Sequence, residues 1–382
     1  MRKLTRRAAI AGGAALVAGG GLWWSRSAKA PLGMEIPEEF LARGAALMAN
    51  TVSVDVHSHP GRSFLVGADP DSLMIRMMRD GFEAERIADM RNAKVTASLF
   101  SVVADFALLG LEGGSLRAAR EFEPEEAHTD FNRQLERLLA TIDAGLIGLA
   151  LSPEDIRTAQ RRGEQVALLA SEGGDFIEDR LERLEEAYAA GLRSVTLVHY
   201  HVNQLGDVQT EPAVHDGLTP LGRAVVQEMN RLGMIVDVAH ASFATCKDVV
   251  SESKVPVMLS HSNLDSGATP SSRFISHEHA RMIADAGGIV GAWPSGIGSE
   301  SLADFVDQVL ALVNVVGAGH VAIGTDMDGN YKPVLDEYAD FPLLAAGLLF
   351  RGLSERDTAC VLGGNFLRLF DDVSTPPRNM AL

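Results

Sequence analysis

The stretch VDVHSHPG, residues Val54–Gly61, decides how the rest of this 382-residue sequence is interpreted. Two histidines, His57 and His59, stand two residues apart at the end of an apolar run. Side chains two residues apart on a β-strand point to the same face of the sheet. If the run is a strand, it presents two imidazoles side by side at its carboxyl end, and the remaining sequence has to explain why.

Seven further apolar, β-branched runs follow, separated by amphipathic segments such as 177–190 and 219–232. Buried parallel strands read as near-continuous apolar runs because helices cover both faces of the sheet. Eight strand–helix units predict an α/β fold, a (β/α)8 TIM-type barrel. A doubly wound open sheet is the structural alternative. The eight runs are Thr51–His57, Lys94–Val103, Val166–Gly173, Ser194–Tyr200, Met234–His240, Val255–His261, Gly288–Trp293 and His320–Asp326.

Polar side chains occupy the carboxyl ends of most of these runs, where a barrel of this kind builds its active site. Neutral imidazoles and carboxylates suit zinc and similar metals as ligands. So many ligands indicate two metal ions, with a bridging carboxylate and a shared water whose pKa they lower. The resulting metal-bound hydroxide would hydrolyse an amide, ester or similar bond. The residues in this position are His57, His59, Glu172, His199, His240, His261 and Asp326.

The first thirty residues have the layout of an export signal. Four basic residues precede a small, apolar, glycine-rich stretch, and residues 28–30 (Ala-Lys-Ala) have the small-x-small form of a cleavage site. The pair Arg6-Arg7 indicates a twin-arginine signal over residues 1–30, and hence a periplasmic or otherwise exported protein. A plain secretory signal or an uncleaved membrane anchor is the alternative.

Length, charge and cysteine content limit the remaining possibilities. We expect one catalytic barrel over residues 31–373 and a loose C-terminal tail over residues 374–382. The formal charge is −17, and it becomes −23 without residues 1–30, which carry six basic residues and no acidic one. Binding to nucleic acid is therefore not expected, nor strong membrane contact after signal removal. Cys246 and Cys360 are too few for a disulfide framework and are expected as small buried side chains, although one bridge stays open.

Other polar residues are assigned to supporting roles. The stretch from Ala104 to Asp130 is interpreted as an insertion over the barrel mouth or rim, with its acidic residues in solvent. His201 is expected to pack in a loop rather than to bind metal. Asp55 is a candidate for orienting the metal ligands through contacts on the side away from the metal. Asp328 either does the same or caps its loop.

Five motifs, taken in order, resemble the renal-type membrane dipeptidases, a family of zinc-dependent barrel enzymes that hydrolyse dipeptides. The resemblance extends from about Val52 to Phe370. Each motif is weakly specific alone, but the ordered set is strongly specific. The motifs are VDVHSHPG, LLASEGG, SVTLVHYHVNQLGD, MIVDVAHAS with VPVMLSHSN, and HVAIGTDMDG.

The resemblance implies a metal-dependent hydrolase barrel, two zinc or similar ions, a dipeptide substrate and a role for each polar residue. His57 and His59 resemble the ligands of the first metal, and Glu172 resembles the bridging carboxylate. His240 and His261 resemble the ligands of the second metal. The family resemblance also allows a homodimer.

Three further residues resemble the substrate-binding residues of the family. His199 resembles the histidine that contacts the substrate carbonyl or the tetrahedral oxyanion. Arg273 resembles the arginine that holds the terminal carboxylate, for which a fork of N–H donors is suited. Asp326 resembles the aspartate that binds the substrate amine and handles a proton.

One departure and two rival functions accompany this prediction. The family has His-x-Asp at the first motif, whereas this chain has His59 in the second position, which removes one negative charge from the site. The first rival is an amidohydrolase acting on N-acyl amino acids, lactams or lactones. The second is a periplasmic binding protein with a vestigial metal site, against which the intact set of polar strand ends argues.

Overall fold

The computed structural model describes residues 29–70, 75, 81–112, 115–269 and 271–375. Most of the predicted signal, residues 1–28, therefore lies outside the described residues, as does the greater part of the predicted tail, residues 376–382. None of the helices in the described ranges is long and apolar enough to span a bilayer.

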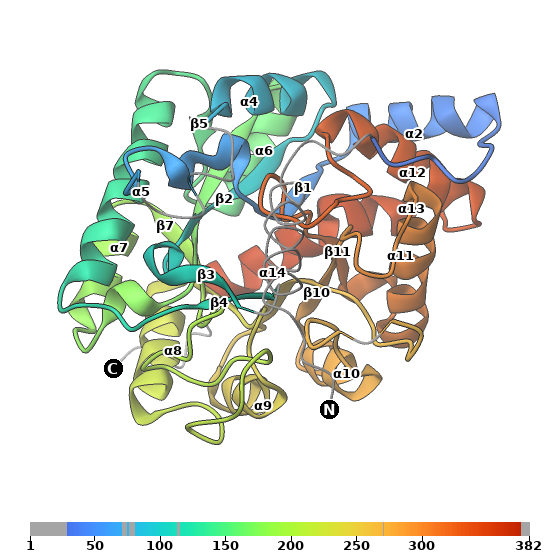
Figure 1. Ribbon diagram of the computed structural model, residues 1–382. Coiled ribbons are helices and arrows are strands. Elements are labelled where there is room, and N and C mark those ends of the chain that lie inside the picture. Colours follow the sequence, from blue (N-terminus) through green and yellow to red (C-terminus); the bar gives the residue numbers. More distant parts are fainter. Residues whose placement is uncertain (1–28, 71–74, 76–80, 113–114, 270, 376–382) are drawn as a thin grey trace, which may run out of the picture.

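Eight parallel strands close into a barrel, as predicted from the eight apolar runs (Figure 1). The strands pair in the order β2-β1-β11-β10-β9-β8-β7-β6, and β2 pairs with β6 along its whole length, which excludes the open sheet. Every residue of these strands is buried, as expected when helices cover the outside and side chains fill the inside. The barrel strands are β1 (Val54–Ser58), β2 (Ala97–Val103), β6 (Val166–Glu172), β7 (Leu192–Thr196), β8 (Ile235–Asp237), β9 (Met258–Ser262), β10 (Ile289–Ala292) and β11 (Val321–Ile323).

The helices form an outer ring around the barrel (Figure 1). The predicted helix start at Thr219 is confirmed, since its hydroxyl accepts the N–H of Gly222 and Pro220 opens the helix. The helix predicted over 177–190 begins only at Glu182, because Glu178 has a left-handed φ of 50°. The α-helices are α2 (Glu38–Asn50), α4 (Glu83–Asn92), α5 (Glu126–Asp143), α6 (Pro153–Arg162), α7 (Glu182–Ala189), α8 (Pro220–Leu232), α9 (Phe243–Glu252), α10 (His277–Asp285), α11 (Leu302–Val316), α12 (Phe341–Phe350), α13 (Glu355–Ala359) and α14 (Asn365–Ser374).

The stretch after β2 is an insertion, as predicted, and it carries structure of its own. A short 3-10 turn, η2 (Phe106–Leu108), leads into an antiparallel hairpin of β3 (Leu109–Glu112) and β4 (Ser115–Ala118). Apolar residues of η2 and both hairpin strands line a cavity at the carboxyl ends of the barrel strands. The insertion therefore helps to build the entrance of the barrel and is more than a solvated excursion.

Candidate metal centre and active site

The carboxyl ends of the barrel strands bring five side chains together, which we call the strand-end cluster: His57, His59, Glu172, His240 and His261. His57 is the fourth residue of β1, and His59 follows that strand directly. Glu172 is the last residue of β6. His261 belongs to β9, and His240 comes three residues after β8. All five side chains are buried.

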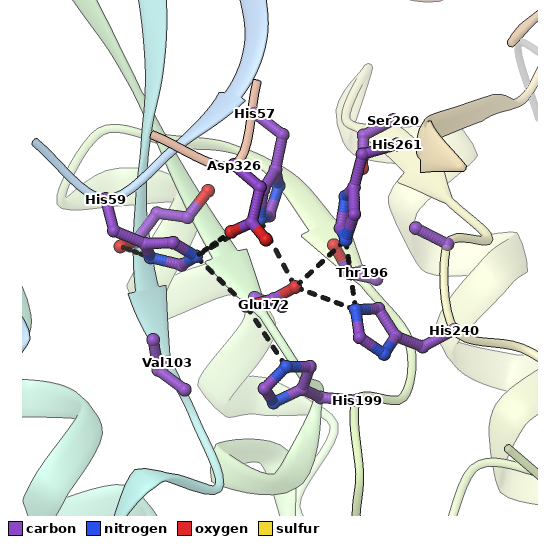
Figure 2. Close-up of polar contacts among 12 residues, drawn as sticks. His57, His59, Val103, Glu172, Thr196, His199, His240, Ser260, His261 and Asp326 are labelled. Atoms are coloured by element: carbon purple, nitrogen blue, oxygen red, sulfur yellow. Dashed lines mark hydrogen bonds and ion pairs between the residues drawn. The ribbon is translucent and has the colours of Figure 1, made fainter. Parts of the chain in front are cut away.

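Glu172 is the centre of this cluster, and imidazole nitrogens approach both of its oxygens (Figure 2). Its Oε2 lies 3.1 Å from Nε2 of His59, and its Oε1 lies 3.2 Å from Nε2 of His57. Nε2 of His240 and Nε2 of His261 lie 3.0 and 3.5 Å from the same Oε1. The carboxylate thus contacts both pairs of histidines, as a ligand shared by two ions would have to.

The spacing within each histidine pair fits a metal ion. Nε2 of His57 and Nε2 of His59 are 3.2 Å apart, and the corresponding distance between His240 and His261 is 3.1 Å. Two nitrogen ligands of one tetrahedral zinc ion, each about 2.0–2.1 Å from the metal, lie about 3.3 Å apart. At this distance two imidazole nitrogens either share a proton in an N–H···N hydrogen bond or both direct their lone pairs at one cation. The donor set therefore fits a divalent metal at each pair.

Hydrogen bonds to Nδ1, the imidazole nitrogen that faces away from Glu172, orient the rings so that Nε2 faces Glu172. Nδ1 of His59 lies 3.0 Å from the backbone carbonyl of Ser101, which can only accept, so Nδ1 carries the proton. Nε2 of His59 then directs a lone pair toward Glu172. Nδ1 of His261 lies 3.0 Å from the hydroxyl of Ser260, which can donate or accept and so orients the ring without fixing its tautomer. Such outer contacts orient histidine ligands in metal sites.

The electrostatics of the cluster favour neutral imidazoles at His240 and His261, beside an ionised Glu172. Burial, together with the positive charge of Arg273, holds the pKa of His240 well below its ordinary value. Burial and neighbouring histidines do the same to the pKa of His261. Burial alone would raise the pKa of Glu172, but the charges of His199 and His57 hold it well below its usual range. His240 and His261 are therefore neutral beside an ionised carboxylate, which are the forms that bind a metal. Burial alone would also lower the pKa of His59, but its hydrogen bonds to Asp326 and Glu172 raise it to about 10, so metal binding at His59 would release a proton.

Two residues of the site adopt a backbone conformation that is unfavourable for their type. His240 has a φ of 64° and Asp326 a φ of 53°, both in the left-handed region. Such a conformation costs a non-glycine residue on the order of 1 kcal/mol or more and is maintained where a site requires a side chain to point in one direction. Here it turns the two side chains into the barrel mouth, where both line the cavity.

Asp326 and Arg273 supply opposite charges at the same cavity, separated by Trp293. Asp326 Oδ1 lies 3.4 Å from Nε2 of His59, and its Oδ2 accepts the indole N–H of Trp293 at 3.3 Å. The Arg273 guanidinium lies over the Trp293 ring, 5.3 Å from its centroid, and its Nη2 lies 3.0 Å from Nε2 of His240. Nε and Nη1 of Arg273 are buried and have no hydrogen-bond partner among the described residues. Buried N–H donors left in this state indicate a place for an acceptor that comes from outside.

The cavity above the cluster has a volume of about 420 Å³. Seven of the eight side chains predicted from the sequence line it, and the eighth, His57, lies directly below Glu172. The seven lining residues are His59, Glu172, His199, His240, His261, Arg273 and Asp326. The structure therefore brings the whole predicted set into one site.

Comparison with known proteins agrees with this geometry. Residues 41–382 match the model of the membrane dipeptidase family, peptidase family M19. The chain is 34% identical over 266 residues to the dipeptidase verJ of Clonostachys rogersoniana, a match that covers 68% of this chain and 66% of that protein. It is 35% identical over 229 residues to the dipeptidase aclJ of Aspergillus oryzae, covering 57% of this chain and 54% of that protein. The chain thus spans about half to two thirds of the length of these curated relatives.

This chain belongs to the membrane dipeptidase family. Solved structures agree on the fold. The probable dipeptidase PvdM of Pseudomonas aeruginosa aligns with a TM-score of 0.73 at 20% identity, over 88% of this chain and 99% of that chain. A metallopeptidase from Rhodobacter sphaeroides, liganded with a phosphinate mimic of L-Ala-D-Ala, aligns with a TM-score of 0.70 at 20% identity, over 85% and 99%. The predicted family resemblance and the predicted barrel are both confirmed.

Among the residues that the sequence interpretation missed, Asp105 contributes most to this family member's site. Its buried carboxylate holds Nδ1 of His199 at 2.7 Å and accepts the backbone N–H groups of Tyr200 and His201. Burial alone would lower the pKa of His199, but the charges of Asp105 and Glu172 raise it. Asp105 comes two residues after β2, the same strand-end position as the predicted residues, and this position was the available signal.

The residues assigned to supporting roles lie outside the cluster. His201 is held between Asp175 (2.6 Å) and Glu121 (2.9 Å) and does not contact the cluster. Asp328 accepts the backbone N–H of Gly61 and pairs with Arg86 at 2.6 Å, so it fixes the loop that follows His59.

Asp55 lies on the first strand beneath the cluster, and it binds both the backbone N–H and the hydroxyl of Thr325. It thereby ties β1 to the segment that leads to Asp326. Of the two cysteines, Cys246 is buried as expected and Cys360 is half-buried. Both are free, so the open bridge is excluded.

Proposed function

We propose that this protein is an exported metallopeptidase that cleaves dipeptides at a centre of two zinc or similar divalent ions. The observation that carries the proposal is the arrangement of Arg273 and Asp326 in one small cavity above Glu172. A dipeptide is a zwitterion with charges at both ends and the scissile bond between them. Arg273 lies on one side of Trp293 and offers a positive charge with unpaired buried N–H groups. Asp326 lies on the other side and offers a carboxylate. These two groups match the two ends of the substrate.

His57, His59 and Glu172 would hold one ion, and Glu172, His240 and His261 would hold the other. When bound, the ions lower the pKa of a water and polarise the carbonyl to be attacked. His59 in place of the family's aspartate leaves Glu172 as the carboxylate at the first ion, with Asp326 Oδ1 nearby at 3.4 Å from His59. The imidazole remains a suitable zinc ligand.

The other residues bind the substrate and move protons. Arg273 donates Nε–H and Nη1–H to the terminal carboxylate in the fork geometry that a carboxylate favours. Asp326 accepts N–H groups of the substrate's ammonium and can hold a proton released during cleavage. His199 keeps a proton on Nδ1 through Asp105, and its raised pKa favours a second proton on Nε2. That Nε2–H can donate to the oxyanion as negative charge develops there.

Export is the remaining part of the proposal, and it rests on the sequence of residues 1–30. The carbonyls of Pro31 and Leu32 accept the N–H groups of Leu302 and Ala303 at the start of α11. Cleavage after Ala30 would keep these hydrogen bonds and would remove the ion pair of Lys29 with Asp340. Mass spectrometry of the exported protein should give Pro31 as the first residue, and retention of residues 1–30 in the membrane fraction would favour an anchor.

The proposed activity is tested by altering the two ends of the substrate in turn. The zinc-loaded protein should cleave a free dipeptide, and amidation of its C-terminus should lower kcat/KM roughly 30- to 1000-fold, on the scale of a charged hydrogen bond lost in a closed site. N-acetylation should also lower it, because Asp326 would face a neutral amide. Equal cleavage of acetylated and free dipeptides would favour the amidohydrolase alternative. Equal cleavage of amidated and free dipeptides would remove Arg273 as the carboxylate site.

A further inference from the structure

One side of the cavity is a continuous apolar surface, which we call the apolar wall: Phe64, Val103, Phe106, Leu109 and Leu116. These residues belong to a small hydrophobic cluster that is separate from the main core of the barrel. The rings of Phe64 and Phe106 are in contact, with centroids 5.2 Å apart. Leu109 and Leu116 belong to the hairpin of the insertion. None of the five side chains has a role in the metal or substrate binding proposed above.

The apolar wall reaches the Asp326 side of the centre at Phe64. The ring of Phe64 packs against the ring of His59 at 5.5 Å, and His59 is the neighbour of Asp326 at 3.4 Å. Val103 lies two residues after Ser101 on β2. The backbone carbonyl of Ser101 accepts the hydrogen bond from Nδ1 of His59. A substrate amine at Asp326 therefore lies beside this wall, together with the carbon atom that carries the first side chain of a dipeptide.

The surroundings of Arg273 are different. Ser271 and Ser272 precede it, and Thr210 and Glu211 reach the cavity on a loop that is held there by the bond from Gln209 N–H to the carbonyl of His240. At the rim, Arg117 pairs with Glu211 at 3.3 Å and joins the hairpin to this loop. Apart from the ring of Trp293, which the guanidinium itself covers, the residues named on the Arg273 side of the cavity are polar, and an ion pair bounds this side.

We infer that the site selects dipeptides whose N-terminal residue has a large apolar side chain, and that it gives little advantage to an apolar side chain on the C-terminal residue. The inference rests on the proposed dipeptidase function, which fixes the direction of the substrate. Burying a leucine-sized side chain against the wall removes apolar surface from water, whereas a polar side chain there loses hydration without gaining partners. One methylene group in such a pocket changes kcat/KM by about 10- to 200-fold.

The test compares four dipeptides on the zinc-loaded protein: Leu-Gly, Ser-Gly, Gly-Leu and Gly-Ser. We expect kcat/KM for Leu-Gly to exceed that for Ser-Gly by about 10- to 100-fold, and the values for Gly-Leu and Gly-Ser to agree within about threefold. Equal rates for Leu-Gly and Ser-Gly would overturn the inference while leaving the dipeptidase activity in place. A leucine preference at the C-terminal position would overturn it as well. Failure to cleave any dipeptide with metal bound would remove the proposed function and the inference together.

A substitution in the apolar wall can test substrate specificity in a protein that still folds. Leu116 is half-buried on the hairpin, so Leu116→Asp is accommodated more easily than a change at the fully packed Phe106. We expect Leu116→Asp to lose the preference for Leu-Gly over Ser-Gly and to gain at least about fivefold in kcat/KM for Lys-Gly, because a carboxylate would face the basic side chain. The matched control is Leu151→Asp, a leucine that is 43% exposed and lies outside the cavity. An unchanged ranking of the dipeptides in Leu116→Asp would contradict the inference.

Discussion

The strand-end cluster and the apolar wall meet in one cavity, yet they are built in different ways. The cluster is supplied by barrel strands, and its side chains are held by buried contacts such as the one from His59 to the Ser101 carbonyl. The apolar wall comes largely from the insertion after β2 and is held by ring and methyl packing. Under the proposed function, the chemistry is fixed by the barrel, whereas the choice of substrate depends on a segment that can change without disturbing the proposed metal ligands.

The largest expected effect comes from removing the charge at the centre of the cluster. Glu172→Gln takes the carboxylate that we propose as the bridge away from both histidine pairs, so bound metal should fall well below two ions per chain. We expect kcat/KM for a dipeptide to fall by at least about 1000-fold, equivalent to about 4 kcal/mol of transition-state stabilisation. The same substitution at the rim, Glu211→Gln, is the matched control and should keep both metals. Metal content near two with activity within tenfold of wild type would show that Glu172 is not the bridge.

Arg273 should show the next largest effect, and it should depend on the substrate. Arg273→Ala should lower kcat/KM for a free dipeptide by roughly 30- to 1000-fold, about 2–4 kcal/mol, because a carboxylate would be left without its cation. For the amidated dipeptide, kcat/KM of Arg273→Ala should be only slightly lower than kcat/KM of the wild type, because amidation has already removed the charge that Arg273 would hold. The measurement is a cycle of two proteins and two substrates. Additive losses would mean that the guanidinium does not contact the carboxylate.

Asp105→Asn should have a smaller effect, which appears in kcat rather than in KM. The amide can still accept the backbone N–H groups of Tyr200 and His201, but it cannot accept from Nδ1 of His199 at the same time. We expect kcat to fall about 10- to 100-fold while KM stays within about threefold, since His199 would lose its orientation. The matched control is Asp175→Asn, the same change beside His201, which should leave kcat within threefold. Similar losses in both variants would indicate a general structural effect.

His201 connects the two regions and should affect stability more than catalysis. Its imidazole lies between Asp175 of the barrel and Glu121 of the insertion. Burial alone would lower its pKa, but hydrogen bonds to these carboxylates raise it to about 9. Because the folded pKa lies above the unfolded value of about 6.5, this stabilisation is complete below about pH 6.5 and is lost as the pH rises through 9.

We therefore expect His201→Gln to lower the free energy of unfolding by about 1–2 kcal/mol at pH 6, with a smaller difference at pH 10. Denaturant unfolding of both proteins at the two pH values provides the measurement. The exposed His215 offers a control, since His215→Gln should cost little at either pH. A difference for His201→Gln that does not change with pH would mean that the imidazole is not charged in the fold.

The same contrast explains what could be predicted from the sequence. Glu172, His240 and His261 were recognisable because a polar residue at the end of an apolar run has few other reasons to be there, and parallel strands bring such ends together. Arg273 follows no strand directly and was found only through the family resemblance. Asp105 was missed although it stands at a strand end, because Ala104 and Phe106 around it continue the apolar character of the run.

The apolar wall could not be predicted from the sequence. Phe106, Leu109 and Leu116 are ordinary apolar residues, and the same pattern would serve equally well in a core. Only the fold shows that the hairpin turns them toward the cavity. Long-range placement of an insertion depends on packing partners that are remote in sequence, such as Phe64, and neither composition nor periodicity records these partners.

A metal titration tests the central claim, that the strand-end cluster is a two-metal hydrolytic centre, most directly. The protein is stripped with a chelator and reloaded with increasing zinc, and bound metal per chain is measured together with hydrolysis of a free dipeptide. We predict no hydrolysis without metal, and activity that reaches its maximum at two ions per chain. Full activity in the metal-free protein, or saturation of both binding and activity at one ion per chain, would contradict the account.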